Sequence, residues 1–247
     1  MSATPVGVVT GAASGIGAAT AHWLAAHGLD VVCCDIDDGP GRAVADEVGA
    51  TYVSLDVGDA AAWADLHVRL RDEGRPVTRA VLNAGMLTRA EPLAFLDVTP
   101  ERFQRVRAVN LDGVVLGILA LAPLIARHGG SIVATASLAG LGPYEADPIY
   151  AATKHGIVGL VRSAAPQLAA AGVRLHAICP GGVDTGLLPR DRKAAISAAG
   201  RPMLDPAEVA AAIGDLLDRA DHGLVHTIVH GRGSERYEFR GVPGPRP

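Results

Sequence analysis

Short apolar runs alternate with longer amphipathic segments along the whole chain. The runs have the length and the Val, Ile and Ala content of strands buried on both faces, and several intervening segments have helical periodicity. This alternation predicts a single doubly wound α/β domain over residues 1–247, with a parallel sheet and no internal repeat. The predicted strands are 6–10, 30–35, 51–55, 79–82, 131–136, 174–178 and 224–230. The predicted helices are 15–26, 59–73, a helix that Thr99-Pro100-Glu101 opens with cap-like residues, 113–126, 150–171 and 206–220. Asp59 is the expected N-cap of the second, and Pro166 should kink the helix at 150–171 or end its first part.

A glycine-rich turn joins the first strand to its helix. The residues that it offers to a ligand are Gly11, Ser14, Gly15, Ile16 and Gly17. Bare backbone lets a pyrophosphate approach, and the helix N-terminus supplies N–H donors and a positive dipole. A turn without a ligand is the alternative, but its place directly after the first strand favours dinucleotide binding. The Gly-Lys-Ser/Thr signature of a P-loop is absent from this turn.

The second strand ends in Asp35, eighteen residues after Gly17. A carboxylate at that distance accepts hydrogen bonds from the adenosine ribose and repels a 2′-phosphate. The next residue is Ile36 rather than the arginine that suits NADP, although Arg42 lies nearby. The pattern therefore favours NAD over NADP.

Two later strand ends carry further candidate cofactor contacts. Asp56-Val57 follows the third strand, where an adenine amino group would be met. The small-residue turn Asn83-Ala84-Gly85 follows the fourth strand and would let the backbone pass close to the cofactor.

Tyr150 and Lys154 are four residues apart in a predicted helix, so they share one face. A phenol normally loses its proton near pH ~10, and a nearby ammonium group favours the phenolate. The pair would suit proton transfer to a ketone or from an alcohol. Taken alone, however, this spacing is also typical of an ordinary surface pair on a helix.

Composition narrows the class of protein. Apolar residues make up 49% of the chain, charged residues 19%, and the net charge is −4 without a basic run. Binding to nucleic acid or to an anionic membrane is therefore not expected. The three cysteines lack metal-ligand spacing, and the histidines lack a third ligand, so no metal site is predicted. We see no signal peptide and expect a soluble, cytoplasmic protein.

Three segments have features of their own. Residues 113–126 are apolar on nearly every side, which predicts that a second subunit covers this helix. Residues 186–204 lack a clear period and are predicted to be a substrate lid. The tail, 236–247, has the composition of a disordered end.

The ordered motifs resemble the short-chain dehydrogenase/reductase family over essentially the whole chain. The matching motifs are Thr10-Gly11-x-x-x-Gly15-x-Gly17, Asn83-Ala84-Gly85, Asn110, Ser137, Tyr150-x-x-x-Lys154 and Pro180-Gly181. The resemblance implies a seven-stranded Rossmann sheet and hydride transfer between a nicotinamide and a carbinol carbon. It also implies dimer contacts through the helices at 113–126 and at Tyr150, or a homotetramer with the last strand at a second interface.

The resemblance also implies residue roles. Tyr150 would be the acid/base, and Ser137 would steady the substrate oxygen. Lys154 would hold the nicotinamide ribose and tune the tyrosine, and Asn110 would position a proton-relay water. Val183 and Thr185 would bind the carboxamide, beside Pro180-Gly181. The predicted pocket for a small-molecule alcohol or ketone is formed by Ser137, Leu138, Tyr144, Glu145, Leu187, Leu188 and Met203.

More narrowly, Ser137-Leu138-Ala139-Gly140-Leu141 and residues 150–159 look like the hydroxyprostaglandin dehydrogenase branch. This hints at an NAD-dependent secondary-alcohol dehydrogenase. Two departures from the family pattern stand out: Leu82 replaces a usual asparagine, and His230-Gly231-Arg232-Gly233 replaces a usual Asp-Gly-Gly. A non-catalytic, NAD-sensing protein of the same fold is the alternative. A sugar-nucleotide epimerase is disfavoured because little chain follows Thr185.

Overall fold

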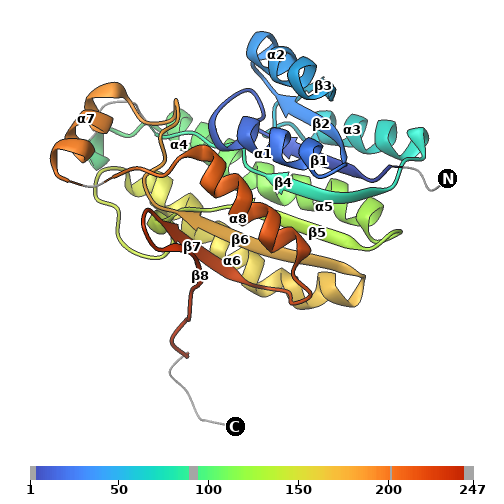
Figure 1. Ribbon diagram of the computed structural model, residues 1–247. Coiled ribbons are helices and arrows are strands. Elements are labelled where there is room, and N and C mark those ends of the chain that lie inside the picture. Colours follow the sequence, from blue (N-terminus) through green and yellow to red (C-terminus); the bar gives the residue numbers. More distant parts are fainter. Residues whose placement is uncertain (1–3, 89–93, 201, 242–247) are drawn as a thin grey trace.

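Eight strands form one sheet with helices on both faces in the computed structural model, which describes residues 4–88, 94–200 and 202–241 (Figure 1). Their order is β3-β2-β1-β4-β5-β6-β7-β8, and only the last pair is antiparallel. The predicted doubly wound parallel sheet is confirmed, but the count of seven strands is wrong by one. The strands are β1 (Val6–Thr10), β2 (Asp30–Asp35), β3 (Thr51–Ser54), β4 (Val77–Leu82), β5 (Gly130–Thr135), β6 (Val173–Pro180), β7 (Val225–Val229) and β8 (Gly233–Arg236).

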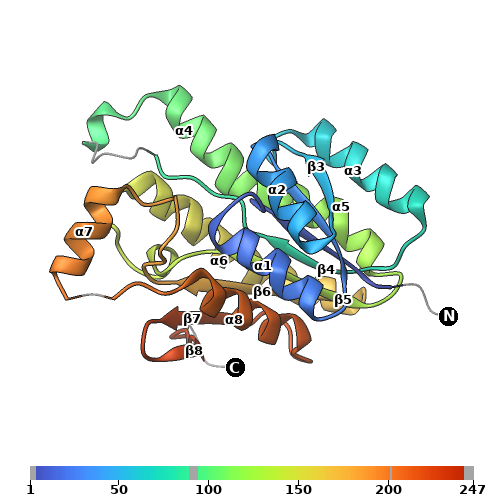
Figure 2. The ribbon, with the colours of Figure 1, turned by 45° about the horizontal axis from the view of Figure 1, so that its top comes forward.

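The helices divide between the two faces of the sheet. One face carries α1 (Gly15–Ala26), α2 (Asp38–Val48) and α8 (Pro206–Asp218), and the other carries α3 (Ala60–Glu73), α5 (Gly113–Ile125) and α6 (Pro148–Ala170). Helices α4 (Pro100–Arg107) and α7 (Arg190–Ala198) lie beyond the carboxyl ends of the strands (Figure 2). Each face buries its own cluster of Val, Leu, Ile and Ala side chains. Because the chain has few aromatic residues, these aliphatic side chains supply most of both cores.

The strand order creates a crevice between β1 and β4. The chain leaves these neighbouring strands toward opposite faces, and ligands bind at such a point in open α/β sheets. Thr10 joins the two strand ends, since its Oγ1 accepts hydrogen bonds from the backbone N–H groups of Asn83 (2.9 Å) and Ala84 (3.1 Å). Leu82, where the family pattern has an asparagine, is a buried core residue. A single hydroxyl thus fixes the small-residue turn against the glycine turn.

The C-terminal departure from the family pattern forms the extra strand. The glycines Gly231 (φ 76°) and Gly233 (φ 73°) supply the left-handed backbone that lets the chain reverse after β7. Strand β8 then pairs with β7 along four residue pairs. Phe239 packs beneath the Arg162 guanidinium, with 3.7 Å between the guanidinium carbon and the ring centroid. Residues up to Phe239 are thus held against the domain, whereas 242–247 lie outside the described residues, so a disordered end stays a prediction.

Three helix predictions also need correction. The predicted lid, 186–204, contains helix α7, although its sequence lacks a clear apolar period. Helix α6 begins at Pro148 rather than Tyr150, and Pro166 does not end it, because the helix continues to Ala170. Helix α2 was not predicted at all. The predicted N-caps of α3 and α4 are confirmed: Asp59 accepts from Ala61 N and Thr99 accepts from Arg102 N.

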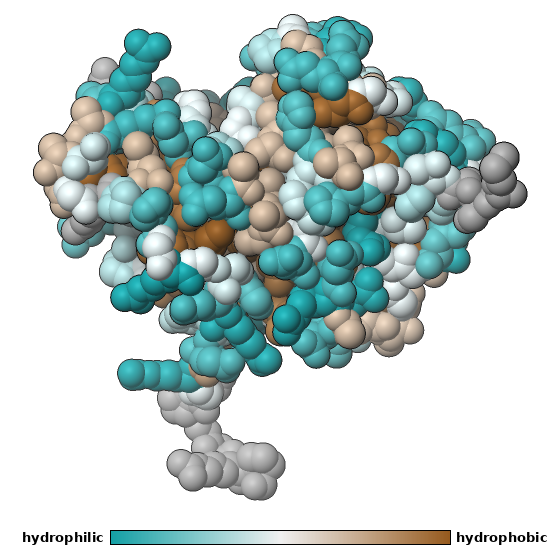
Figure 3. All heavy atoms as spheres, viewed as in Figure 1, coloured by the Kyte–Doolittle hydropathy of each residue, from teal (hydrophilic) through white to brown (hydrophobic). Residues whose placement is uncertain are grey.

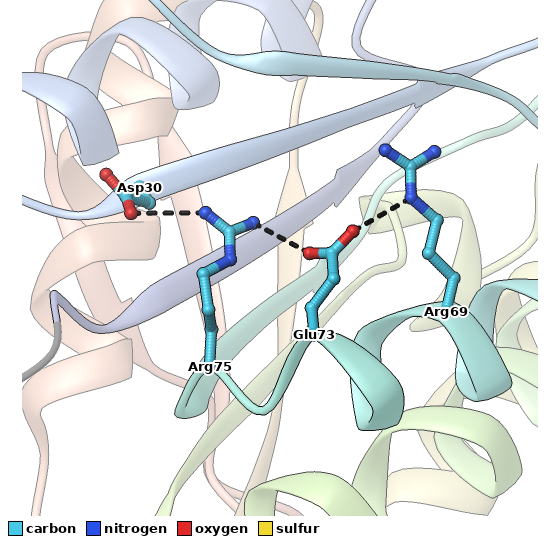
Figure 4. Close-up of polar contacts among 4 residues, drawn as sticks. All are labelled: Asp30, Arg69, Glu73 and Arg75. Atoms are coloured by element: carbon cyan, nitrogen blue, oxygen red, sulfur yellow. Dashed lines mark hydrogen bonds and ion pairs between the residues drawn. The ribbon is translucent and has the colours of Figure 1, made fainter.

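An ion-pair network lies at the opposite end of the sheet (Figure 4). Arg75 contacts Asp30 (3.2 Å) and Glu73 (3.2 Å), and Glu73 also contacts Arg69 (3.0 Å). It links the start of β2 to the end of α3. Because the groups are partly exposed, each pair contributes only about 0–1 kcal/mol. The network tightens the end of the sheet that is remote from the crevice.

Helix α5 remains partly uncovered in the single chain. On the outer side of α5, Leu119 is 66% exposed, whereas the side chains on the inner side of the helix pack in the core. By length and composition alone, the helical run Pro100–Ile125 is apolar enough to cross a membrane, but half of it is buried inside the domain. Core helices of globular domains have the same character. Coverage of α5 by a second subunit stays a prediction.

A buried histidine makes stability depend on pH. His176 on β6 is fully buried, and within the described residues neither ring nitrogen has a hydrogen-bond partner. Burial, assisted by the nearby Arg174, lowers the pKa of His176 from 6.5 to about 4. The unfolded chain therefore binds a proton between these pH values that the folded chain does not. Stability is present above pH 6.5 and is lost as the pH falls toward 4.

We expect His176→Leu to remove this dependence. Relative to the variant, the wild type should lose about 1.4 kcal/mol of unfolding free energy per pH unit as the pH falls below 6.5. Urea unfolding at pH 7.5, 5.5 and 4.5 measures the difference, and the same substitution at the exposed His128 is the control. Parallel pH profiles for wild type and His176→Leu would contradict the assignment.

Candidate active site

A cavity of about 760 Å³ opens at the carboxyl end of the sheet. Its lining comes from the turns after β1, β2, β3, β4, β5 and β6, together with α4, α6 and α7. Figure 3 shows hydrophobic side chains in the hollow between α7 and α8 on one face of the molecule. All predicted site residues line the cavity except Gly17, Asn110, Glu145 and Met203. The sequence motifs thus converge on one space.

The four exceptions have different positions. Gly17 packs against backbone, since a Cβ there would lie 1.9 Å from the Gly11 carbonyl oxygen. Met203 lies beside Gly182, and the Glu145 side chain is exposed to solvent. Asn110 is fully buried behind the cavity wall. These residues therefore affect the cavity through their neighbours rather than by lining it.

The phosphate end of the cavity fits a dinucleotide. Gly11 (φ 67°) and Gly15 (φ 54°) both adopt left-handed backbone, which brings bare main chain to the cavity. A Cβ at Gly11 would lie 2.9 Å from the Ala84 Cα, so a larger residue does not fit. The Ser14 side chain makes no capping hydrogen bond to α1. The first N–H groups of α1 are thus left for an anion.

The adenosine end holds a fixed carboxylate. Asp35 accepts hydrogen bonds from Ala13 N (2.9 Å) and from Asp37 N (3.0 Å), which orient its two oxygens at the wall. The nearby Arg42 guanidinium stacks over the Tyr52 ring, 4.9 Å from its centroid, and pairs with Asp38 at 3.8 Å. The local charge that faces a ribose is therefore negative.

Tyr150, Lys154 and Ser137 meet at the centre of the cavity. Tyr150 is 8% exposed and Lys154 is 3% exposed. The Lys154 ammonium donates a hydrogen bond to the Thr135 carbonyl (2.8 Å) and lies 5.5 Å from the Tyr150 ring centroid. The Ser137 side chain lines the same cavity, and its Oγ accepts a hydrogen bond from Ala139 N (3.1 Å). A phenol, a hydroxyl and an ammonium group thus share one largely desolvated space.

Burial controls the protonation of this centre. It raises the pKa of Tyr150 to about 12, although the Ser137 hydroxyl opposes the rise. It lowers the pKa of Lys154 to about 8. The sequence predicted that the ammonium group would lower the phenol pKa. The net shift of the Tyr150 pKa is in the opposite direction, because the cost of desolvating the phenolate exceeds the opposing effect of the Ser137 hydroxyl.

Asn110 lies in a π-helical turn, Ala108–Asp112, between α4 and α5. Its side-chain oxygen accepts from Met86 N (2.8 Å), and its amide nitrogen donates to Met86 O (2.9 Å) and Thr153 Oγ1 (3.2 Å). Protein groups thus take both amide hydrogens and one lone pair of the side-chain oxygen. It ties the segment after β4 to α6.

The sequence interpretation missed several lining residues and one supporting residue. Met86, Leu87, Arg105 and Ile196 line the cavity. Asp147 is the N-cap of α6 and accepts from Tyr150 N at 3.0 Å. The Asp147-Pro148 pair is a typical helix start and gave a usable signal. Nothing in the local sequence marks the lining residues.

Comparison with known proteins agrees with this geometry. A family model described as short chain dehydrogenase matches residues 5–195. The chain is 40% identical over 235 residues to the cis-4-hydroxycyclohexanecarboxylate dehydrogenase of Sinomonas cyclohexanicum, covering 91% of this chain and 93% of the relative. The trans-4-hydroxycyclohexanecarboxylate dehydrogenase of that organism is 33% identical over 194 residues, 74% of each chain.

A solved structure is similar over nearly the whole chain. The 3-ketoacyl-(acyl-carrier-protein) reductase from Brucella melitensis, complexed with NADH, has a TM-score of 0.82 and 29% identity. The match covers 92% of this chain and 98% of that chain. A nicotinamide cofactor is therefore supported, without distinguishing NAD from NADP. The narrower resemblance to the hydroxyprostaglandin dehydrogenase branch stays a prediction.

The buried Lys154 ammonium should cost stability. We expect Lys154→Met to raise the unfolding free energy at pH 7 by roughly 1–3 kcal/mol, because it removes a desolvated charge. The gain should shrink between pH 8 and pH 10.5, where the unfolded lysine keeps a proton that the folded lysine has lost. Urea unfolding of the cofactor-free protein at pH 7 and pH 10 measures both effects. A methionine variant less stable than the wild type at pH 7 would contradict this account.

Proposed function

The chain belongs to the short-chain dehydrogenase family and is an oxidoreductase acting on hydroxyl or ketone groups, and we propose that it interconverts a secondary alcohol and its ketone with NAD. The observation that carries this proposal is the convergence of Ser137, Tyr150 and Lys154 in one cavity. An NAD-sensing protein would not need their proton chemistry. Bound NAD would supply the hydride acceptor for the alcohol carbon.

Tyr150 moves the proton in this proposal. With a pKa of about 12 in the free protein, its phenol stays protonated at neutral pH and is ready to donate to a ketone oxygen. Ser137 donates a hydrogen bond to the same oxygen as it gains negative charge. In the oxidative direction Tyr150 accepts the carbinol proton, and the Lys154 charge stabilises the phenolate.

Two further roles come with the proposal. Lys154 holds the nicotinamide ribose, and Val183 and Thr185 orient the carboxamide. In this proposal the relay water expected at Asn110 is held by the backbone of the π-helical turn, since both amide hydrogens of the side chain already donate to Met86 and Thr153. A π-helical turn frequently marks such functional sites.

The substrate that we propose is a six-membered alicyclic secondary alcohol. Two relatives act on 4-hydroxycyclohexanecarboxylates by name. The cavity wall around Tyr150 is largely hydrocarbon and aromatic, which suits a saturated ring. Its members are Leu87, Ala139, Tyr144 and Leu188.

The first test is turnover. With NAD, the wild type should oxidise at least one alcohol among cyclohexanol and the cis and trans 4-hydroxycyclohexanecarboxylates, followed by nicotinamide absorbance. Tyr150→Phe should lower kcat by about 10²–10⁴-fold, because the transferable proton is lost. NADH binding, followed by fluorescence, should be unchanged. Tyr237→Phe, remote from the cavity, is the matched control, and a fully active Tyr150→Phe enzyme would refute the role of the phenol.

The second test is cofactor preference. We expect kcat/KM with NADH to exceed that with NADPH by at least about tenfold, since Asp35 repels a 2′-phosphate. Asp35→Ser should reduce the ratio, whereas Asp46→Ser, on the exposed side of α2, should leave it unchanged. Faster reduction with NADPH in the wild type, at equal concentrations, would show that the NAD assignment is wrong.

A further inference from the structure

The three residues after Gly85 form a loop that is held at both ends. Met86 exchanges two backbone hydrogen bonds with the Asn110 side chain. Thr88 is 4% exposed and donates to Asp147 through both its backbone N–H (2.8 Å) and its Oγ1 (2.6 Å). The Thr88 carbonyl in turn accepts from Arg102 at 2.7 Å. Few surface loops are fixed this completely.

Leu87 lies between the two anchor points and lines the cavity. It is 8% exposed and packs in one cluster with Tyr150, Ala139 and Ala151. Another part of the lining comes from the segment that contains Leu187, which is 41% exposed. One wall is therefore fixed by hydrogen bonds, and the other has room to adjust.

Asp147 connects this fixed wall directly to the tyrosine. Its carboxylate is 5% exposed and accepts from Thr88 N, Thr88 Oγ1 and Tyr150 N. The same group therefore starts helix α6 and holds the loop. Any shift of Thr88 changes the position of Leu87 relative to the phenol.

We propose that Leu87 is a specificity-determining residue, which limits the size of the group next to the carbinol carbon, and that the Thr88–Asp147 pair positions it. This inference rests on the proposed function. A ring carbon bearing a substituent beside the carbinol would meet the Leu87 side chain, whose backbone is anchored through both neighbours and whose side chain is packed against Ala139 and Ala151. An unsubstituted cyclohexanol ring passes beneath it.

The role of Leu87 in selecting substrates by size is tested with two substrates, cyclohexanol and 2-methylcyclohexanol. In Leu87→Ala, the kcat/KM ratio of the methylated to the unmethylated alcohol should rise about tenfold or more over the wild type. The removed side-chain atoms make room for the added methyl group. An unchanged ratio in an enzyme that still turns over cyclohexanol overturns the inference.

The positioning pair is tested at Thr88. Thr88→Val removes the hydroxyl that donates to Asp147 and should raise the same ratio by about threefold or more, whereas Thr88→Ser should keep the wild-type ratio. Thr99→Val removes a comparable hydroxyl, the N-cap of α4, and should leave the ratio unchanged. If Thr88→Val shifts the ratio no more than Thr99→Val does, the pair has no positioning role.

A double-mutant cycle distinguishes positioning of Leu87 by Thr88 from a general loosening of the active site. If Thr88 acts through Leu87, adding Thr88→Val to Leu87→Ala should change the ratio no further. A full additive change would assign Thr88 an effect of its own and overturn the pairing. If Thr88→Val does not fold, Asp147→Asn takes its place in the same cycle. The control is then Asp205→Asn, at the start of α8. Failure of the wild type on every alcohol would instead contradict the proposed function.

Discussion

The burial of one ammonium group constrains the whole arrangement at the carboxyl end of the sheet. Lys154 is 3% exposed, and its charge is met by the Thr135 carbonyl at the end of β5. Such a charge is costly to desolvate, so it stays in place only where the surrounding structure is firmly packed. The packing comes from the next turns of α6, whose Ile157, Val158 and Val161 enter the core. The apolar core thus holds the polar site.

The same burial acts with opposite sign on the two titrating groups. From ordinary values of 10.0 and 10.5, the pKa values move apart, to about 12 for Tyr150 and about 8 for Lys154. A four-residue spacing predicts proximity, and proximity alone predicts that the ammonium lowers the phenol pKa. Spacing carries no information about desolvation, which depends on residues from other strands. The pair was therefore predictable, but its protonation was not.

The secondary-structure elements also divide into those that the local sequence determines and those that depend on contacts with distant residues. Most of strands β1 to β7 were visible as runs of buried apolar residues, although β3 is only partly buried. Asp59 and Thr99 indicated the starts of two helices. Helix α2 was missed because Gly39, Pro40 and Gly41 argue against a helix. Its helix survives through packing, since the Tyr52 ring lies directly against Gly41. Strand β8 was missed because its sequence is short and polar.

The candidate site divides in the same way. Motif residues that meet the cofactor end are fixed by backbone requirements, as at Gly11 and Gly15, so their spacing in the sequence was informative. Leu87 has no such requirement. It becomes a wall only because Asp147, about sixty residues later, holds its neighbour Thr88. Substrate-facing residues of this kind depend on tertiary contacts.

Strand β8 also bears on how copies of the chain would assemble. The resemblance implied a second interface at the last strand, but the outer edge of β7 is already paired with β8. The β7 edge therefore offers no template for another strand, and among the described residues the sheet now ends at the short, mostly exposed β8. Helix α5 differs, because Leu119 on its outer side remains exposed while its inner side fills the core. Physical reasoning therefore favours α5 over β7 as the place where a second copy would gain most from contact.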